Sequence, residues 1–260
     1  MISHTIEHDM YLRYCASPNP EGTIVYIHGL GESGLCFEDI IIHPKLRHWC
    51  HLVPDLCGYG KSLWQKMPMR LEDHANHLVE WLKKRNTSQV VILGHSMGGV
   101  IGLMLCEKHP EIAQAFVNVE GNISLEDCSF SEKAASYSLK QLLDQGLQNI
   151  FDTIYHDGLD NHALRTYYAS LRMCDPRVYY LNSKELVELS ANNNLANRQG
   201  VLTFPNIYIL GNPRGTGAYS RSLLSAANVE WQAVENAGHW PFVDQNDRFA
   251  EEMLSFLHKL

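Results

Sequence analysis

The sequence lacks the features of proteins that are embedded in a membrane, bound to nucleic acid or built around a metal ion. No apolar run approaches the roughly 18 residues that a membrane-spanning helix needs. No stretch is rich in lysine and arginine, and the formal net charge is −8, so we expect neither nucleic acid nor an anionic membrane surface as the main partner. The 14 histidines do not occur at metal-ligand spacing, and we expect no metal and no cofactor.

Paired cysteines are absent as well. The seven cysteines are an odd number and no two stand at CxxC spacing, so we expect reduced thiols. Residues 1–9 alternate between polar and apolar side chains and do not follow the basic-then-apolar order of a secretory signal. These features predict a cytoplasmic protein.

The composition is that of an ordinary globular protein. Of the 260 residues, 45% are hydrophobic and 19% are charged, and no repeat or low-complexity segment is visible. This length is large for one simple domain and small for two full domains. We therefore expect a single core that carries an insertion.

A turn between a strand and a helix surrounds Ser96. Residues 90–93 are apolar and predict a buried strand, and an apolar run of helical length resumes at Gly99. Between them lies Gly94-X-Ser96-X-Gly98, in which the serine must take a strained backbone conformation that small neighbours leave room for. The N–H groups at the start of the following helix would stabilise a negative charge beside the hydroxyl.

Strand and helix patterns alternate along most of the chain. Short apolar or alternating segments predict eight strands, at residues 2–8, 10–15, 23–27, 51–54, 90–93, 115–119, 206–210 and 229–234. Helices are expected between most of them, at residues 36–48, 70–84, 99–105, 220–227 and 248–260. This order predicts an α/β fold, with a mainly parallel eight-stranded sheet and helices on both faces. Ligands of such sheets bind at the carboxyl ends of the strands.

Residues 122–203 interrupt the alternation. They contain helical patterns and no strand pattern, and about eighty residues are far more than a simple crossover needs. We expect an inserted helical cap here, with a core made of residues 1–121 and 204–260.

Four segments resemble the landmarks of the α/β-hydrolase fold, in the order that the family has. They are His28-Gly29, Asp55-Leu56-X-Gly58-X-Gly60-X-Ser62, Gly94-His95-Ser96-Met97-Gly98-Gly99 and Asn236-Ala237-Gly238-His239-Trp240-Pro241. The resemblance covers essentially the whole chain. It implies that Ser96 is the nucleophile and that His239 is the general base and then the general acid. It also implies that the N–H groups of Leu30 and Met97 form the oxyanion hole.

Serine chemistry by itself requires residues of these kinds. A serine hydroxyl is a weak nucleophile at neutral pH, so a histidine must take its proton and later give it to the leaving group. A carboxylate must hold that histidine in the right tautomer and stabilise its charged form. We expect His28 and Asp55 to brace loops through local hydrogen bonds, and His95 to be a spacer in the turn.

The acid departs from the pattern that is common in the family. Many relatives place an aspartate a few residues after the strand that corresponds to residues 206–210. Here no carboxylate follows that strand before Glu230. The acid must therefore come from another part of the rim.

Glu120 ends the apolar strand 115–119, on the same rim as Ser96. Burying its charge is unfavourable, and pairing with His239 would relieve that cost. A subset of the family, which includes some haloalkane dehalogenases, resembles this arrangement. Glu120 is therefore the predicted acid, with Glu126 and Asp127 as alternatives.

These residues predict a serine hydrolase that cleaves an ester, a thioester or a lactone of a small molecule through an acyl-enzyme on Ser96. Haloalkane dehalogenases and epoxide hydrolases of this fold have an aspartate at that position, so those activities are not expected. C–C bond hydrolysis of dienone compounds and cofactor-free perhydrolysis use the same triad and stay open. A ligand receptor with little turnover is an alternative of another class.

The substrate is expected to bind in a largely apolar pocket between cap and sheet. The loop residues beside the triad and the aromatic residues of the cap are the candidates for its wall. Those that we predict to bind substrate are Leu30, Trp240, Phe130 and Tyr137.

Overall fold

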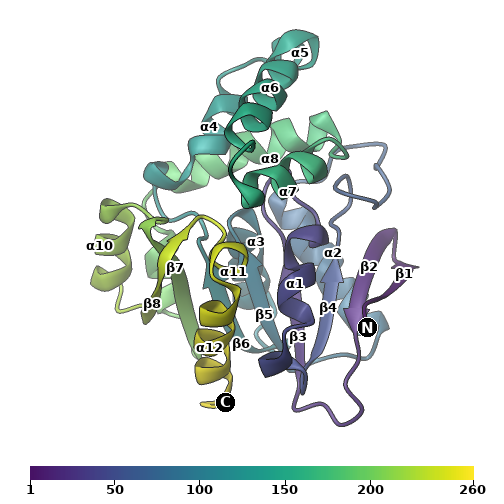
Figure 1. Cartoon of the computed structure of the whole chain (residues 1–260), viewed down its shortest axis with the longest axis vertical. Coiled ribbons are helices and arrows are strands. Elements are labelled where there is room, and N and C mark those ends of the chain that lie inside the picture. Colours follow the sequence, from purple (N-terminus) through teal and green to yellow (C-terminus); the bar gives the residue numbers. More distant parts are fainter.

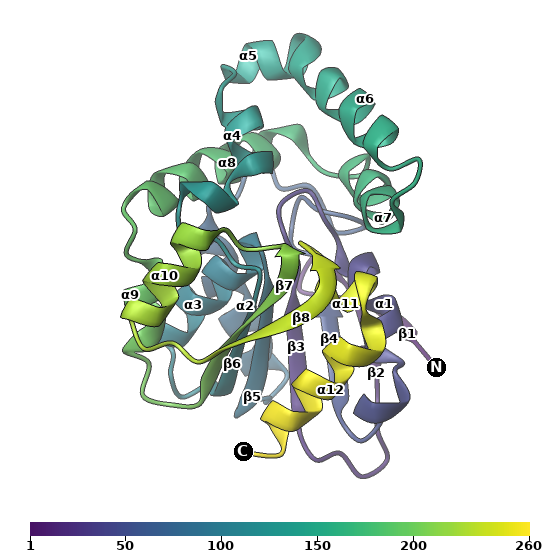
Figure 2. The ribbon, with the colours of Figure 1, turned by 60° about the vertical axis from the view of Figure 1, so that its left-hand side comes forward.

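A computed structural model, which describes residues 1–260, contains one eight-stranded sheet with helices on both faces (Figures 1 and 2). The strands are β1 (Ser3–Glu7), β2 (Met10–Cys15), β3 (Thr23–Ile27), β4 (Cys50–Pro54), β5 (Val90–His95), β6 (Ala113–Val119), β7 (Asn206–Arg214) and β8 (Trp231–Gly238). Their order is β1-β2-β4-β3-β5-β6-β7-β8. β2 pairs antiparallel with β1 and β4, and every other pair is parallel. The predicted fold class is confirmed.

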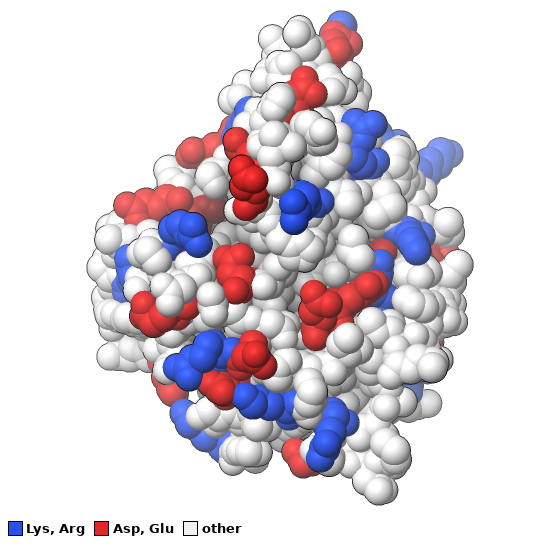
Figure 3. All heavy atoms as spheres, viewed as in Figure 1, with Lys and Arg blue, Asp and Glu red and all other residues white.

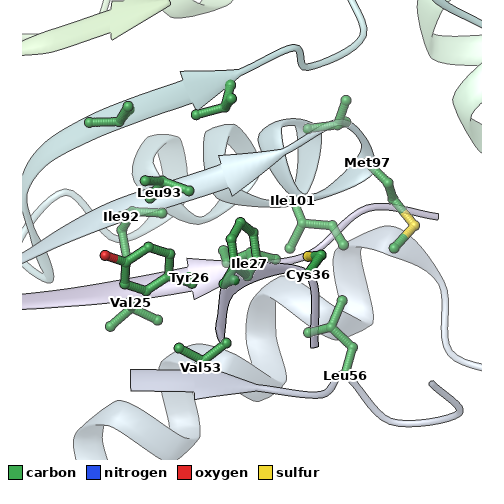
Figure 4. Close-up of a cluster of buried hydrophobic side chains, with 14 of the residues drawn as sticks. Val25, Tyr26, Ile27, Cys36, Val53, Leu56, Ile92, Leu93, Met97 and Ile101 are labelled. Carbon is green, nitrogen blue, oxygen red and sulfur yellow. The ribbon is translucent and has the colours of Figure 1, made fainter. Parts of the chain in front are cut away.

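Helices cover both faces of the central strands. One face carries α1 (Glu38–Ile41), α11 (Pro241–Asp244) and α12 (Asn246–Leu257), and the other carries α2 (Leu71–Lys84) and α3 (Met97–Lys108) (Figure 1). All six residues of β5 are buried, as expected for a parallel strand with no solvent face. Figure 4 shows Ile92 and Leu93 of β5 in a buried cluster with Ile27 of β3 and Ile101 of α3.

The prediction of a continuous helix over residues 36–48 is wrong. The structure has two short 3-10 helices, Gly34–Phe37 and Pro44–Leu46, with α1 between them. Pro44 has no N–H, and its ring disfavours the helical conformation of the residue before it, so a helix does not run through this position. The His43 side chain instead accepts a hydrogen bond from the Lys45 N–H at 3.2 Å, which starts a new turn.

The segment between β6 and β7 forms helices and no strand. These are α4 (Ser129–Ala135), α5 (Leu139–Gln141), α6 (Leu147–Asp157), α7 (His162–Leu171), α8 (Pro176–Ala191) and α9 (Leu195–Gly200), with a 3-10 helix at Leu125–Asp127 and a π-helical turn at Leu142–Gly146. Helices α4 to α8 lie beyond the carboxyl ends of the parallel strands (Figure 2). By contrast, α9 packs against α3 and α10 (Ala218–Ala226), beside the sheet. We call residues 122–203 the helical insertion.

On the face that Figure 3 shows, acidic and basic side chains are interspersed, and neither sign of charge dominates. No helix in the structure combines the length and the apolar character that crossing a membrane requires.

The turn after β5 is held in a strained conformation. Ser96 has φ 52° and ψ −120°, values that non-glycine residues rarely adopt. A side chain at Gly94 would overlap the carbonyl of Gly98, and a side chain at Gly98 would overlap the carbonyl of Ile27. The two glycines are therefore needed for the close approach of α3 to β3 and β5, which fixes the position of Ser96.

One buried carboxylate joins three loops at the carboxyl ends of the strands. Glu32, which follows β3, accepts hydrogen bonds from the Gly29 N–H at 2.6 Å and from His95 Nδ1 at 2.8 Å. It also accepts a hydrogen bond from the indole N–H of Trp240, in the loop after β8. His95 in turn donates from Nε2 to the main-chain carbonyl of His239 at 2.7 Å. The loops after β3, β5 and β8 are thus tied together at Glu32.

The contacts of Glu32 offset the cost of burying its charge. The two ring nitrogens of His95 contact the Glu32 carboxylate and the main-chain carbonyl of His239. Burial alone would raise the pKa of Glu32, but the positive charge and the hydrogen bond of His95 lower it to about 2. The carboxylate is therefore ionised at neutral pH.

Replacing Glu32 by alanine should lower the free energy of unfolding by about 3 to 5 kcal/mol, because buried donors of Gly29, His95 and Trp240 lose their charged acceptor. Urea unfolding, followed by circular dichroism at pH 7, measures this loss. Glu38→Ala is the matched control, since Glu38 is one-third exposed and bonds Arg13, which also pairs with Asp55. We expect a loss below about 1 kcal/mol for the control. Equal losses in both variants would contradict a special contribution of Glu32 to the free energy of unfolding.

Candidate active site

Ser96, His239 and Glu120 lie at the carboxyl ends of neighbouring parts of the sheet. Ser96 follows β5, Glu120 follows β6, and His239 follows β8. Ser96 and the His239 ring both line a small cavity of about 20 Å³, which we call the inner cavity. No hydrogen bond joins the Ser96 hydroxyl to the His239 ring, and catalytic hydrogen bonds of this kind are often formed only with substrate present.

Glu120 is bonded to His239, to β7 and to the turn that follows β7. Its Oε2 lies 3.2 Å from Nδ1 of His239. Its Oε1 accepts hydrogen bonds from the N–H groups of Gly211 at 2.7 Å and Thr216 at 3.0 Å. The Glu120 side chain is 2% exposed and its φ is 51°, so the backbone is strained where the carboxylate turns toward β7. These three hydrogen bonds compensate for burying the charge.

The Glu120 carboxylate also changes the acidity of His239, whose side chain is 22% exposed. Burial opposes the charged ring, but the hydrogen bond and the negative charge of Glu120 outweigh it and raise the pKa of His239. With Nδ1–H directed at Glu120, the other ring nitrogen, Nε2, is the one free to accept a proton. The ring is therefore suited to take a proton and to carry the resulting charge.

The two alternative acids are engaged elsewhere. Oδ2 of Asp127 accepts hydrogen bonds from the N–H groups of Ile123 and Ser124 and from the Ser220 hydroxyl. Oε2 of Glu126 accepts one from the N–H of Tyr219. Neither carboxylate is hydrogen-bonded to the His239 ring. Of the three carboxylates considered from the sequence, Glu120 is the one that the fold brings to this histidine.

Leu30 and Met97 are the two residues whose backbone N–H groups the sequence predicts to form an oxyanion hole beside Ser96. Leu30 lines the inner cavity, and its N–H makes no hydrogen bond within the protein. Met97 is the first residue of α3, where an N–H has no acceptor within its own helix. The Gly29 N–H, in contrast, is bonded to Glu32. These donors could stabilise negative charge on a substrate oxygen.

Three other polar residues of the motifs lie behind this site. His28 accepts a hydrogen bond from the Leu56 N–H at 3.0 Å and bonds the Gly29 carbonyl at 2.9 Å. Asp55 accepts hydrogen bonds from the N–H groups of Gly34 and Lys61 and pairs with Arg13. Both residues brace loops. His95, which the sequence suggests is a spacer, instead bonds both Glu32 and the main chain of His239.

The inner cavity contains most of the predicted substrate-binding residues. Leu30, Phe130 and Trp240 line it, and the rings of Phe130 and Trp240 lie with centroids 6.1 and 5.0 Å from that of His239. Tyr137, also predicted to bind substrate, lines neither the inner cavity nor the larger cavity described below. Helix α4 ends at Ala135, and the Tyr137 ring lies against Gly146, farther out in the helical insertion.

A second, larger cavity of about 300 Å³ lies on the His239 side and is called the outer cavity. Four residues, Asp127, Phe130, His239 and Trp240, line both the outer and the inner cavity. Its apolar lining is limited to Phe130, Leu164 and Trp240, while charged groups such as Glu126, Asp244 and Arg214 make up much of the rest. The sequence predicts a largely apolar pocket, and this prediction is wrong for the outer cavity.

Three further residues, Glu32, Asn122 and Tyr167, line the inner cavity but are not among the site residues predicted from the sequence. Glu32 offers one local signal, because a carboxylate stands in a glycine-rich loop directly after a buried strand. Asn122 and Tyr167 belong to the helical insertion and have no motif around them. Their positions depend on how the insertion packs on the sheet.

Comparisons with known proteins agree with this architecture. The family model of the alpha/beta hydrolase fold matches residues 22–243. The chain is 24% identical to the 2-hydroxy-6-oxo-6-(2'-aminophenyl)hexa-2,4-dienoic acid hydrolase of Metapseudomonas resinovorans, over 91% of this chain and 84% of that protein. It is 25% identical to the pimeloyl-[acyl-carrier protein] methyl ester esterase of Citrobacter koseri, over 91% and 94%.

Other curated relatives match over shorter regions. The lipase LipV of Mycobacterium tuberculosis is 28% identical, and the match covers 42% of this chain and 41% of the lipase. The chain thus spans about two fifths of the length of that relative.

Solved structures match over the whole chain. The enol-lactonase from Burkholderia xenovorans LB400 superposes with a TM-score of 0.78 at 16% identity, over 98% of this chain and 100% of that one. The N-acyl homoserine lactonase AidH has a TM-score of 0.75 at 16% identity, over 100% and 97%. At such identities the likeness shows the fold alone. With the family match over residues 22–243, it follows that the chain belongs to the α/β hydrolase fold family.

Proposed function

We propose that the protein is a serine hydrolase that cleaves an ester, a thioester or a lactone of a small molecule. The observation that carries the proposal is the hydrogen bond between Glu120 and His239, at a cavity that His239 shares with Ser96 in its strained turn. Among the relatives, the methyl ester esterase and the two lactonases have names that fit this chemistry.

In the proposed mechanism the Ser96 hydroxyl attacks the substrate carbonyl while Nε2 of His239 takes its proton. Glu120 stabilises the imidazolium that forms. The N–H groups of Leu30 and Met97 bind the oxyanion, and His239 then gives the proton to the leaving group. A water molecule, activated by His239 in the same way, releases the acyl group from Ser96.

The two cavities suggest where the two parts of the substrate bind. The leaving group receives its proton from His239, so we assign it to the outer cavity, which His239 lines and Ser96 does not. The acyl group then occupies the inner cavity, beside Ser96 and Leu30. We infer that the helical insertion, residues 122–203, is a cap that completes both cavities, since it contributes Phe130 to each of them.

C–C bond hydrolysis is the second candidate function. It is favoured by the match to a dienoic acid hydrolase over 91% of this chain. Incubation of the purified protein with a 2-hydroxy-6-oxo-dienoate, followed by the loss of its visible absorbance, distinguishes this reaction from ester cleavage.

Ser96→Ala should reduce the hydrolysis of 4-nitrophenyl acetate by on the order of 10⁴-fold or more, because the nucleophile is removed. Circular dichroism should be unchanged, since one oxygen is deleted and nothing is added. Labelling by a fluorophosphonate probe should be lost together with activity. A variant that keeps a tenth of the wild-type activity, with contamination excluded, would rule out Ser96 as the nucleophile.

Glu120→Gln should lower kcat by roughly 10² to 10⁴-fold, because the amide removes the charge that stabilises the imidazolium and can hold the ring in the wrong tautomer. Steady-state kinetics with the same ester measures this loss. Glu132→Gln is the control, since that carboxylate is exposed and lines neither cavity. Similar losses in both variants would show that net charge, and not the contact with His239, is responsible.

The pH dependence of activity should show the effect of Glu120 on the pKa of His239. Protonated His239 cannot accept the serine proton, so activity should fall as the pH drops through the pKa of His239. Because Glu120 raises that pKa, the midpoint of the acid limb should lie above the ordinary value of about 6.5. In Glu120→Gln the midpoint should move to lower pH, as measured by kcat/KM between pH 5 and 9. An unchanged midpoint would contradict the electrostatic role of Glu120.

A further inference from the structure

We propose that the ring of Phe130 is a gate between the two cavities, and that its displacement sets how long an acyl chain can reach Ser96. This inference rests on the proposed function and narrows its substrate class. It comes from the wall that the inner and outer cavities share, in which Phe130 is the side chain that can move without breaking a hydrogen bond.

The outer cavity provides the way in from solvent. Four of the residues that line it are exposed, namely Glu126, Ser129, Asn161 and Arg214. None of the 13 residues that line the inner cavity is exposed. A substrate therefore reaches Ser96 past the wall between the two cavities.

The inner cavity is too small for an acyl chain while that wall stays in place. Its volume is about 20 Å³, and one water molecule alone requires roughly 10 to 15 Å³. The outer cavity, at about 300 Å³, has room for a displaced side chain. Placing an acyl group beside Ser96 thus requires that part of the shared wall move toward the outer cavity.

Three of the four residues in the shared wall are held by hydrogen bonds. Oδ2 of Asp127 accepts hydrogen bonds from two backbone N–H groups and a serine hydroxyl. The His239 ring is bonded to Glu120, and the indole N–H of Trp240 donates to Glu32. Moving any of these side chains would leave a polar group without its partner, which costs free energy.

Phe130, the fourth residue, has no such bond. Its partly buried ring packs against the rings of Tyr167 and Trp240, with centroids 5.1 and 5.9 Å away. Turning the ring about its side-chain torsions loses these contacts but breaks no hydrogen bond. Phe130 is therefore the part of the wall that moves at the lowest cost, and the space that it leaves is bounded by aromatic rings.

The helix that carries Phe130 is held on the core. α4 packs against α8 (Figure 2). On α8, the buried amide of Asn182 accepts a hydrogen bond from the Tyr59 hydroxyl at 2.7 Å and donates one to the Met69 carbonyl at 2.9 Å. Both partners belong to the segment between β4 and α2, so α8 is fixed to the core and supports α4. The gate is thus one side chain and not the insertion as a whole.

The displacement that is needed grows with the acyl chain. An acetyl group requires a small shift of the ring, whereas a hexanoyl chain requires the space that the ring occupies. A single methylene group in a close-fitting pocket already changes selectivity by roughly tenfold or more. We therefore expect Phe130 to discriminate between short and long acyl groups.

The test compares 4-nitrophenyl acetate with 4-nitrophenyl hexanoate, which have the same leaving group. Phe130→Ala removes the ring and should raise the ratio of kcat/KM for the hexanoate to that for the acetate by about tenfold or more. Phe130→Leu keeps a smaller side chain and should give an intermediate ratio. Tyr137→Ala is the matched control, because it removes another partly buried ring of the insertion that lines neither cavity. Its ratio should equal that of the wild type.

A crystal structure with a hexylphosphonate bound covalently to Ser96 identifies the side chain that moves. The Phe130 ring should be turned into the outer cavity, with the hexyl chain against the rings of Tyr167 and Trp240. A Phe130 ring in its present position, with the chain admitted by a shift of the insertion, would overturn the gate.

Labelling of Ser96 by a fluorophosphonate probe separates failure of the gate from failure of the proposed function. If Ser96 is labelled but Phe130→Ala has the same hexanoate-to-acetate ratio as the wild type, the gate is wrong while the serine hydrolase proposal stands. If neither ester is hydrolysed and Ser96 is not labelled, the proposed function fails, and this inference fails with it.

Discussion

The buried ion pair between Glu32 and His95 is the interaction on which the arrangement of the site depends. Glu32 bonds the loop after β3 and the indole of Trp240, and His95 bonds the main chain of His239. Loops at the end of a sheet are ordinarily its most mobile parts. Here a network with little access to water joins the loops after β3 and β8 to the end of β5. The backbone donors near Ser96 and the ring of His239 are therefore fixed relative to each other before any substrate binds.

The parts of the fold that depend on local patterns could be predicted from the sequence. The turn at Ser96 needs glycines at fixed offsets, and the alternation of strand and helix patterns indicates a parallel sheet. Glu120 could be singled out because a charge at the end of a buried strand needs a partner. The partners of Glu32 could not be found in this way, since His95 and Trp240 lie 63 and 208 residues further along the chain.

The residues that line the candidate site could not be predicted from the sequence, for a different reason. Helical periodicity shows which side of a helix is apolar, but not which surface that side covers. Phe130 and Tyr137 are two aromatic residues seven positions apart, yet only Phe130 reaches the sheet, because α4 ends at Ala135. The polarity of the outer cavity comes largely from loop residues such as Arg214 and Asp244, whose side-chain directions no periodic pattern encodes.

The attachment of the helical insertion has a consequence for how such a protein can diversify. The chain enters the insertion just after Glu120 and returns through β7, which pairs with β6. Gly211 of β7 and Thr216, just after that strand, donate N–H groups to the Glu120 carboxylate. Entry and exit are thus held on two neighbouring strands of the sheet. Because the entropy of closing a loop grows slowly with its length, this segment can lengthen, shorten or be exchanged at little cost to the core. Glu120 would stay in place while the range of molecules admitted changed.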